Sequence, residues 1–360
     1  MVRLINNFTR VCRETENGEE ICSCDYRLNI YDCDHSEFYV IVGRILVTLC
    51  ILATIMAIGL LIYLIKVRKQ SFFLSASRDR GWIRPKPMHS YHLIVISYMS
   101  LEAFHLIALQ VELYPNVKAA ELSNITINVL TASIAIFYPI SIVYATPKVE
   151  FTDNYEILSK KNGPNIILVD IIGLILFSLP IFAWFPLASL TGESADMNDI
   201  EGANYYYRAH YLAFVAWEII YVVVLVYFWY KLMSVIKSYI KVIEERHISS
   251  GISNGSQVQT IKKSARNITA PVIALFFGLL TQAIIYIIMS FTHRTKTIYY
   301  FGWNVFFFWI EYVAFPIIAV SVESFLIYYT IISPKDTPTS STNNSNNNNS
   351  KSENSISKTD

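Results

Sequence analysis

The chain contains 360 residues, of which 53% are hydrophobic and only 16% are charged. A soluble domain usually contains about 25% charged residues, so this composition excludes a soluble enzyme, a nucleic-acid-binding protein and a disordered scaffold. The formal net charge is +1, and the distribution of basic residues along the chain is more informative than their sum.

Seven stretches of mostly uncharged residues follow one another along the chain. Each is long enough to cross a hydrocarbon core about 30 Å thick. Backbone groups in hydrocarbon must be hydrogen-bonded within their own segment, so stretches of this length predict helices. The sequence therefore predicts an all-α fold, a polytopic membrane protein with a seven-transmembrane-helix bundle, over residues 40–65, 90–113, 122–145, 165–190, 209–230, 268–291 and 299–331.

The loops between these stretches differ in their content of basic residues. One set, residues 66–89, 146–164, 231–267 and the C-terminal tail, contains 20 Lys and Arg residues, and the other set contains 8. The side richer in Lys and Arg is normally cytoplasmic, so we expect the N-terminus outside and the C-terminus in the cytoplasm. Residues 1–10 lack the apolar core of a signal peptide, and the first helix is expected to act as its own insertion signal.

The N-terminal segment, residues 1–39, contains four of the five cysteines, namely Cys12, Cys22, Cys24 and Cys33. An even number of cysteines in an exported segment predicts two disulfides, for which three connectivities are open. A zinc site is the alternative, but Cys22 and Cys24 are separated by one residue instead of two, and no paired histidines follow. The fifth cysteine, Cys50, is predicted to be a buried apolar residue in the first helix.

Two further features concern the parts of the chain outside the predicted helices. Asn7 begins the sequon Asn7-Phe8-Thr9 on the predicted outer side and is expected to be glycosylated, whereas the sequons at Asn254 and Asn267 lie on or near the predicted cytoplasmic side. Residues 332–360 are rich in Ser and Asn. Because almost nothing in this segment can be buried, we expect a disordered cytoplasmic tail.

Ionisable residues inside a predicted membrane helix are costly and by default face the interior of a bundle. In the second helix, at about 100° per residue, five polar side chains fall within an arc of roughly 80°: Tyr91, Tyr98, Glu102, His105 and Glu112. Two more acids, Glu218 and Glu311, lie deep in the fifth and seventh helices, and Asn304 shares a face with Glu311. Neutral carboxyl groups that hydrogen-bond between helices are the structural alternative. For the three acids together with His105, we favour a functional cavity.

A metal site is a weaker interpretation of the same residues. Glu102 and His105 form a Glu-x-x-His pair on one helix face, but di-metal bundles need two such pairs, and the predicted membrane helices contain no second one. No hydrolase, zinc-protease or phosphate-binding motif occurs in the sequence. The sequence therefore predicts no metal, no cofactor, no catalytic residues and no enzymatic activity.

The seventh helix is rich in aromatic residues, and Trp309 and Tyr312 lie too deep for an interfacial belt alone. They are candidates for the wall of a ligand pocket. Pro139, Pro180 and Pro316 are expected to kink the third, fourth and seventh helices. The complete set of candidate ligand or switch residues is Tyr98, Glu102, His105, Glu218, Asn304, Trp309, Glu311 and Tyr312.

An outside N-terminus with cysteines and a sequon, seven helices, a basic third inner loop and a Ser/Thr-containing tail resemble the plan of the G-protein-coupled receptors over residues 1–332. The resemblance is one of topology. At the inner end of the third helix, residues 144–147 read Tyr-Ala-Thr-Pro where rhodopsin-like receptors have Asp-Arg-Tyr, and Phe315-Pro316 only echoes their Asn-Pro-x-x-Tyr motif. The seven-helix proteins that assist tobamovirus replication share the same plan and remain an alternative.

The predicted inner surface is basic and partly apolar, because the residue pattern predicts that the fifth helix continues beyond residue 230 into the cytosol. The resemblance implies that this surface docks a heterotrimeric G protein or another cytosolic effector. The alternative is that these residues satisfy the positive-inside rule and contact anionic lipid. The residues concerned are Lys231, Lys237, Lys241, Lys262, Lys263 and Arg266.

Two classes of function follow. In the receptor hypothesis, an unidentified extracellular or membrane-borne ligand shifts the balance between two helix arrangements at the plasma membrane. A cytosolic partner then binds one arrangement in preference to the other. The second class is a transporter or intramembrane enzyme in which Glu102, His105, Glu218 and Glu311 handle protons or ions. Transporters often contain repeated halves, and no repeat is visible here, so the sequence favours the receptor.

Overall fold

The computed structural model of the chain describes residues 4, 6–14, 18, 20–75, 81–145, 165–250 and 255–332. The predicted tail beyond residue 332 lies outside these residues. Among them, seven helices are long and apolar enough to cross a membrane. This confirms the predicted all-α, multi-pass membrane architecture.

The helical elements follow the predicted stretches, with longer boundaries at several ends. Three of the spans contain short π-helical segments, which are labelled η, and the last span contains two of them. The elements are α1 (Ser36–Ile62), η1 (Tyr63–Val67), α2 (Pro87–Gln110), α3 (Val117–Ala135), α4 (Phe137–Ala145), α6 (Ile166–Asp196), α7 (Ile200–Ser250), α8 (Gly255–Thr292), η2 (His293–Thr297), α9 (Phe301–Phe308), η3 (Trp309–Val313), α10 (Ala314–Ile327) and η4 (Tyr328–Ile332).

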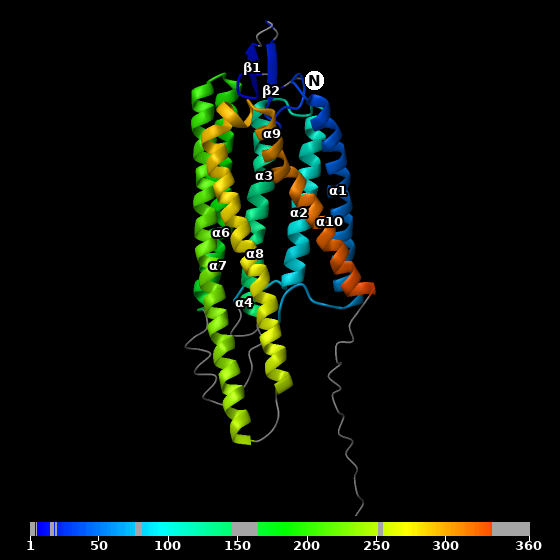
Figure 1. The fold of residues 1–360 in the computed structure, drawn as a ribbon, viewed down its shortest axis with the longest axis vertical. Helices are drawn as coiled ribbons and strands as arrows, with labels where there is room; N and C mark the ends of the chain where they lie inside the picture. The colour runs from blue at the N-terminus through cyan, green and yellow to red at the C-terminus, as the bar shows by residue number, and fades with distance from the viewer. Residues whose placement is uncertain are drawn as a thin grey trace, which may run out of the picture.

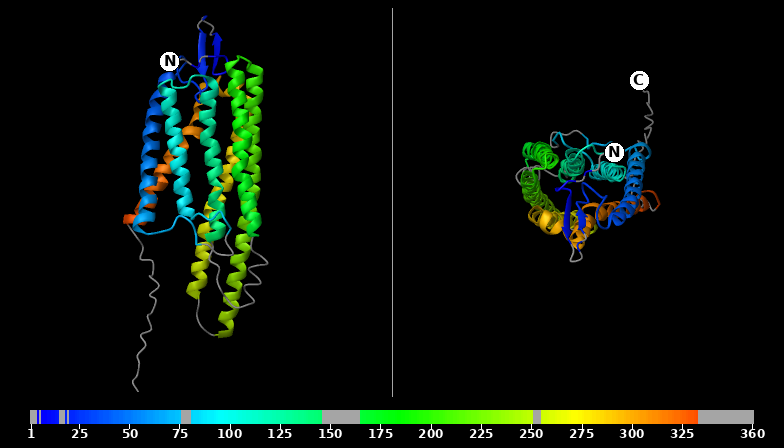
Figure 2. Two further views of the ribbon diagram at one scale, coloured as in Figure 1. Left: turned by 180° about the vertical axis from the view of Figure 1, so that it is seen from behind. Right: turned by 90° about the horizontal axis from the view of Figure 1, so that it is seen from above.

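The spans form a ring in which α1 lies between α2 and α10, and α6 lies between α3 and α7 (Figures 1 and 2). Two short strands, β1 (Arg10–Glu14) and β2 (Glu20–Cys24), make an antiparallel hairpin at one end of this ring. Seen from above, the strands lie over the inside of the ring (Figure 2). We call this end the hairpin end and the other the opposite end.

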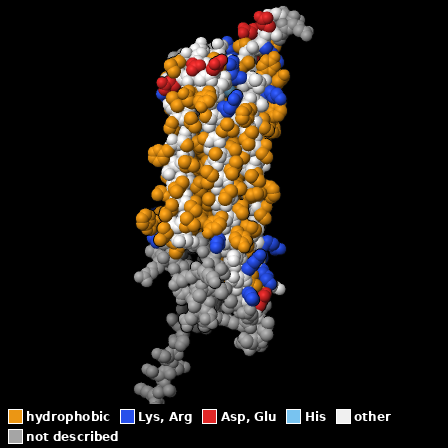
Figure 3. Space-filling view, turned by 90° about the vertical axis from the view of Figure 1, so that its left-hand side faces the viewer, with side chains coloured by type: hydrophobic (Ala, Val, Ile, Leu, Met, Phe, Trp, Pro, Cys, Tyr) orange, Lys and Arg blue, Asp and Glu red, His pale blue; other side chains and the backbone are white. Residues whose placement is uncertain are grey.

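The side of the bundle carries a band of hydrophobic side chains, while charged residues gather towards the two ends (Figure 3). Large apolar residues such as Ile167, Leu174 and Phe182 are 62–77% exposed. A soluble protein rarely exposes so large a continuous apolar surface. The band is therefore the surface that a lipid bilayer would cover.

Proline has no N–H group to bond to the carbonyl four residues earlier in a helix. For two prolines of the spans, Pro139 and Pro180, the carbonyl that is freed accepts a hydrogen bond from α7. The third span is interrupted at Ile136, just before Pro139, and the freed carbonyl of Ala135 accepts a hydrogen bond from the Tyr221 hydroxyl at 3.4 Å. The helix α6 continues through Pro180.

The carbonyl that Pro180 leaves free in α6 is that of Leu176. It accepts a hydrogen bond from the Trp217 indole at 3.1 Å. Trp217 and Tyr221 lie one turn apart on α7, with their rings stacked 5.2 Å apart. One face of α7 therefore supplies the donors that two neighbouring spans lack.

Both predicted disulfides are present, and the structure selects one of the three connectivities. Cys12 faces Cys22 across the hairpin and is bonded to it, and Cys24 is bonded to Cys33. The second bond closes a loop of residues 24–33, which we call the plug loop. Cys50 is a buried free cysteine, as predicted.

Candidate functional site

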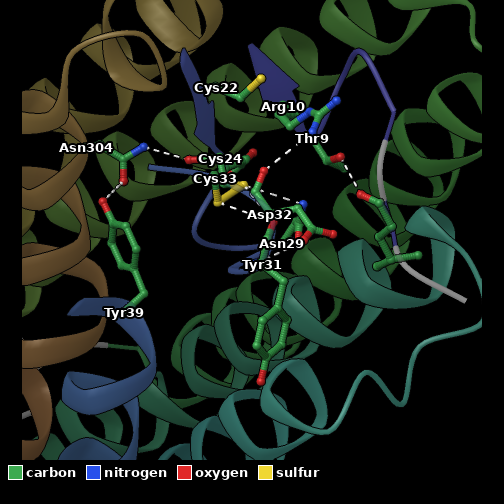
Figure 4. Close-up of a disulfide and its surroundings, with 12 residues drawn as sticks. Thr9, Arg10, Cys22, Cys24, Asn29, Tyr31, Asp32, Cys33, Tyr39 and Asn304 are labelled. Atoms are coloured by element: carbon green, nitrogen blue, oxygen red, sulfur yellow. Dashed lines mark hydrogen bonds between the residues drawn. A yellow bond between two sulfur atoms is a disulfide. The ribbon is translucent and has the colours of Figure 1, made fainter. Parts of the chain in front are cut away.

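The plug loop enters the hairpin end of the bundle. Asp25, Tyr26, Arg27 and Leu28 are each at most 2% exposed, although two of these four residues are charged. The loop is held between the hairpin on one side and the start of α1 at Ser36 on the other. Figure 4 shows the disulfide that closes it, with Tyr31 and Asn29 beside it.

Arg27 is the centre of the contacts that the plug loop makes with the helices. Its guanidinium forms two hydrogen bonds to Asp25, at 2.5 and 3.0 Å, and donates to the Tyr211 hydroxyl at 3.0 Å. The nearest oxygen of Glu121 lies 3.8 Å from Nη1. His293 lies beside both charged groups, with its Nε2 2.9 Å from Asp25 and 3.2 Å from Arg27. These five residues are called the Arg27 cluster.

The Arg27 cluster joins three spans, because Glu121, Tyr211 and His293 lie on α3, α7 and η2 respectively. Two tyrosine rings also face the guanidinium, at 4.8 Å for Tyr207 and 5.7 Å for Tyr211. Aromatic faces and carboxylates are the surroundings in which a buried guanidinium is stabilised. The helices thus form a cation site, and the chain's own arginine fills it.

The charges of this cluster stabilise one another against burial. Burial alone would raise the pKa of Asp25, but the charge of Arg27 and the hydrogen bonds from Arg27 and His293 outweigh burial and hold that pKa well below its usual range. Burial and the nearby Glu311 carboxylate raise the pKa of the Tyr26 hydroxyl well above its ordinary value. Asp25 is therefore ionised and Tyr26 is neutral at physiological pH.

His105 on α2 contacts the backbone of the plug loop. Its Nε2 lies 3.0 Å from the carbonyl of Arg27, and its Nδ1 lies 2.9 Å from the Tyr114 hydroxyl and 3.2 Å from the Ser123 hydroxyl. A carbonyl can only accept, so Nε2 carries the proton and Nδ1 is free to accept. The plug-loop carbonyl therefore identifies the tautomer of His105 as the one protonated at Nε2.

Two residues of the last span bind the plug loop. The Tyr26 hydroxyl donates to Glu311 at 2.5 Å. The Asn304 amide donates to the carbonyl of Cys24 at 2.8 Å and accepts from the Tyr39 hydroxyl at 2.5 Å (Figure 4). Glu311 lies in η3, where the helix widens to a π-helix, a distortion often found at functional positions.

The structure brings five of the eight candidate residues around the plug loop. His105, Asn304 and Glu311 contact it directly. The Tyr98 hydroxyl donates to the Glu311 backbone at 3.1 Å. Tyr312 packs edge-on against Tyr26 at 5.8 Å and donates to Asn124 at 2.6 Å.

The three remaining candidates lie elsewhere. Glu102 and Glu218 are at most 1% exposed, and neither carboxyl group has a hydrogen-bonding partner among the described residues. Trp309 is 50% exposed on the surface of the bundle. Trp309 was predicted to line a pocket from its depth along the seventh helix alone. Depth does not specify which face of a helix a residue occupies.

Sequence reasoning did not single out Asp25, Arg27, Glu121, Tyr211 or His293. Glu121 and His293 lay just outside the predicted helices, because the structure begins α3 at Val117 and continues the sixth span to Thr297. Asp25 and Arg27 lay in a segment expected to be exported. A local signal did exist, since the ten-residue stretch bounded by Cys24 and Cys33 contains four aromatic or aliphatic residues beside those charges.

At the opposite end, α7 and α8 run beyond the other spans (Figure 1). Tyr239, Ile243 and Val258 are buried between the two helices. Of the six basic residues predicted for this surface, Lys231 is partly buried. The other five are exposed, namely Lys237, Lys241, Lys262, Lys263 and Arg266. We call residues 231–266 of α7 and α8 the projection. Nothing is described for residues 251–254 between them.

Comparison of the sequence with protein-family models and with curated proteins, and of the fold with solved structures, found no match.

Proposed function

We propose that the chain is a seven-helix membrane receptor, with the hairpin end outside the cell and the projection in the cytosol. The orientation is supported by the basic loops, which hold 20 Lys and Arg residues on the projection side against 8 on the hairpin side. The disulfides of the hairpin and of the plug loop also suit an oxidising exterior.

The observation that carries the proposal is the Arg27 cluster. Its contacts join separate spans at one end, so a change in the cluster alters how these spans pack against one another. One of them, α7, is a single helix from Ile200 to Ser250. It carries Tyr211 in the cluster and Lys241 on the projection, about 45 Å apart at 1.5 Å per residue. A continuous helix of this kind can transmit a shift at one end to a partner at the other.

The proposal is tested with purified protein in lipid nanodiscs and a panel of heterotrimeric G proteins. We expect the protein to accelerate GDP–GTP exchange on at least one of them. Charge reversal on the projection, Lys237→Glu with Arg266→Glu, should abolish this acceleration. The matched control is Lys296→Glu, which reverses an exposed charge near the hairpin end and should leave exchange unchanged. Failure of the protein to accelerate exchange on any member of the panel contradicts coupling to G proteins.

A proton-coupled transporter is the second candidate, because Glu102 and Glu218 are buried without hydrogen-bonding partners among the described residues. Buried acids inside membrane spans commonly mark proton pathways. Proteoliposomes loaded with a pH indicator separate the two functions. Proton flux that Glu218→Gln abolishes would favour the transporter, and its absence would leave the receptor.

A further inference from the structure

The plug loop has the properties of a bound peptide. It is closed by Cys24–Cys33, and the helices bind both its side chains and its backbone. Three of its side chains are bound by helix residues: Tyr26 by Glu311, Arg27 by Tyr211, and Tyr31 by the carbonyl of Gln110 at 2.5 Å. Two of its carbonyls, those of Cys24 and Arg27, accept from Asn304 and His105.

We infer that the plug loop is a tethered peptide ligand, and that the hairpin end of the bundle is a binding site for a disulfide-closed peptide that presents arginine. This inference rests on the proposed receptor function and names the ligand class of its outer site. The loop sits in that site as part of the same chain, at a high effective concentration.

The chemistry of the helix residues supports a recognition site over simple packing. A segment that only filled the end of a bundle would be stabilised best by apolar side chains, since burying charges carries a desolvation cost of several kcal/mol per ion. Here the bundle supplies Glu121, Glu311 and two tyrosine faces where Arg27 enters. In the described part of the chain, Arg27 is the cation that lies beside Glu121. The bundle is thus complementary in charge to the loop it holds.

The loop is also preorganised. The Cys24–Cys33 bond fixes both ends of the segment, and hydrogen bonds within the segment run from the Leu28 and Asn29 amides to the Asp25 carbonyl at 2.9 Å. Asp25 holds the guanidinium by two hydrogen bonds from within the same loop. Rigid ligands lose less conformational entropy on binding. A synthetic copy of the loop should therefore keep its shape when it is detached from the chain.

The test uses an emptied variant, in which residues 25–32 are replaced by Gly and Ser while Cys24 and Cys33 are kept. The probe is a fluorescent synthetic peptide with the sequence of residues 24–33, closed by its own disulfide. Binding is measured by fluorescence polarisation in nanodiscs that contain no G protein. We expect saturable binding to the emptied variant and no binding to the unaltered protein, whose site is filled.

Two matched comparisons identify the arginine contact. A probe peptide with the Arg27→Ala change should bind the emptied variant about tenfold or more weakly, because a hydrogen bond to a charged group is lost. Glu121→Gln in the emptied variant should weaken the unaltered probe, whereas Glu193→Gln, at an exposed residue of α6, should not. Equal binding of the two peptides, or no saturable binding to a folded emptied variant, overturns the inference.

Low yield of the emptied variant is itself informative, because a bound ligand stabilises the folded state. The peptide is then present throughout solubilisation, and we expect it to raise both yield and thermal stability, with the Arg27→Ala peptide failing to do so. If neither peptide raises them, the inference fails. Nucleotide exchange is measured separately. Peptide binding without nucleotide exchange would contradict G-protein coupling but support the tethered ligand. Nucleotide exchange without peptide binding would support G-protein coupling but contradict the tethered ligand.

Discussion

Burial of Arg27 at 1% exposure depends on the balance of charge in its cluster. Asp25 contributes two hydrogen bonds and Glu121 a further carboxylate, while His293 bridges to Asp25. Removing one partner of such a group leaves the other buried and uncompensated, which costs far more than the pair contributes. The cluster is therefore expected to tolerate little change at any single position.

The first prediction follows for Asp25. Asp25→Asn should lower the free energy of unfolding by about 3–5 kcal/mol, the usual cost of breaking a buried ion pair, as measured by thermal unfolding in detergent. The matched control is Asp34→Asn, whose carboxylate is 43% exposed beside His35 and which should have little effect. A change at Asp25 no larger than at Asp34 would show that the ion pair does not hold the plug loop.

The same residue predicts a pH dependence. The pKa of Asp25 lies below its ordinary value in the folded protein, because Arg27 and His293 outweigh the effect of burial. The stability that this shift provides is therefore complete at neutral pH and is lost only as the pH falls below about 4. The difference in stability between the unaltered protein and Asp25→Asn should shrink over that acidic range. A difference that instead grows in acid would contradict this account.

Glu102 is the second residue for which a single change is informative. It is fully buried on α2, three residues from His105. Glu102→Gln keeps the volume of the side chain, so a purely structural residue should tolerate the change. If Glu102 distinguishes two receptor states, basal or ligand-driven signalling should change at nearly normal surface level. Both quantities must be measured in the same cells, and normal signalling at normal expression would reject a switch role.

At the scale of the elements, α7 donates hydrogen bonds to two carbonyls of neighbouring spans that lack a helical donor because of a proline. The carbonyls of Leu176 and Ala135 accept from Trp217 and Tyr221, which lie on one face of α7. In hydrocarbon a carbonyl has no water to replace a missing partner. These two bonds therefore fix α7 against both the third and the fourth spans at their weakest points.

Removing these donors should loosen that contact. Tyr221→Phe is expected to lower the free energy of unfolding by about 0.5–1.5 kcal/mol, the net worth of a typical hydrogen bond, read from thermal unfolding in detergent. Trp217→Phe should lower it by more, because it also removes buried ring volume. Trp309→Phe is the matched control, because it makes the same chemical change at a residue that is 50% exposed. The account fails if Trp217→Phe costs no more than Trp309→Phe.

At the scale of the whole molecule, the proposed orientation places the hairpin end outside. Asn7 is exposed there and should carry a glycan, whereas the sequons at Asn254 and Asn267 should not. Asn7→Gln should abolish the shift in electrophoretic mobility that a glycosidase produces. A shift that persists in Asn7→Gln, or that disappears in Asn254→Gln, would reverse the orientation and with it the proposed direction of signalling.

The membrane architecture could be predicted from the sequence, because the length and apolarity of a segment are local properties, and a segment of this kind must be helical in a bilayer. The same held for the presence of two disulfides, which follows from an even number of cysteines in one short segment. Three residues of the predicted stripe, Tyr98, Glu102 and His105, are buried as expected, since helical periodicity fixes which residues share a face, whereas Tyr91 and Glu112 are partly exposed.

The three-dimensional structure was needed to show that the plug loop fills the hairpin end. The contacts that bury Arg27 join positions far apart in the chain, such as the 184 positions between Arg27 and Tyr211. No local pattern encodes the pairing of a charge in the N-terminal segment with partners on α3, α7 and η2. The choice of disulfide connectivity depends in the same way on the register of β1 and β2. These features arise because a buried charge is stable only where several distant segments bring its partners together.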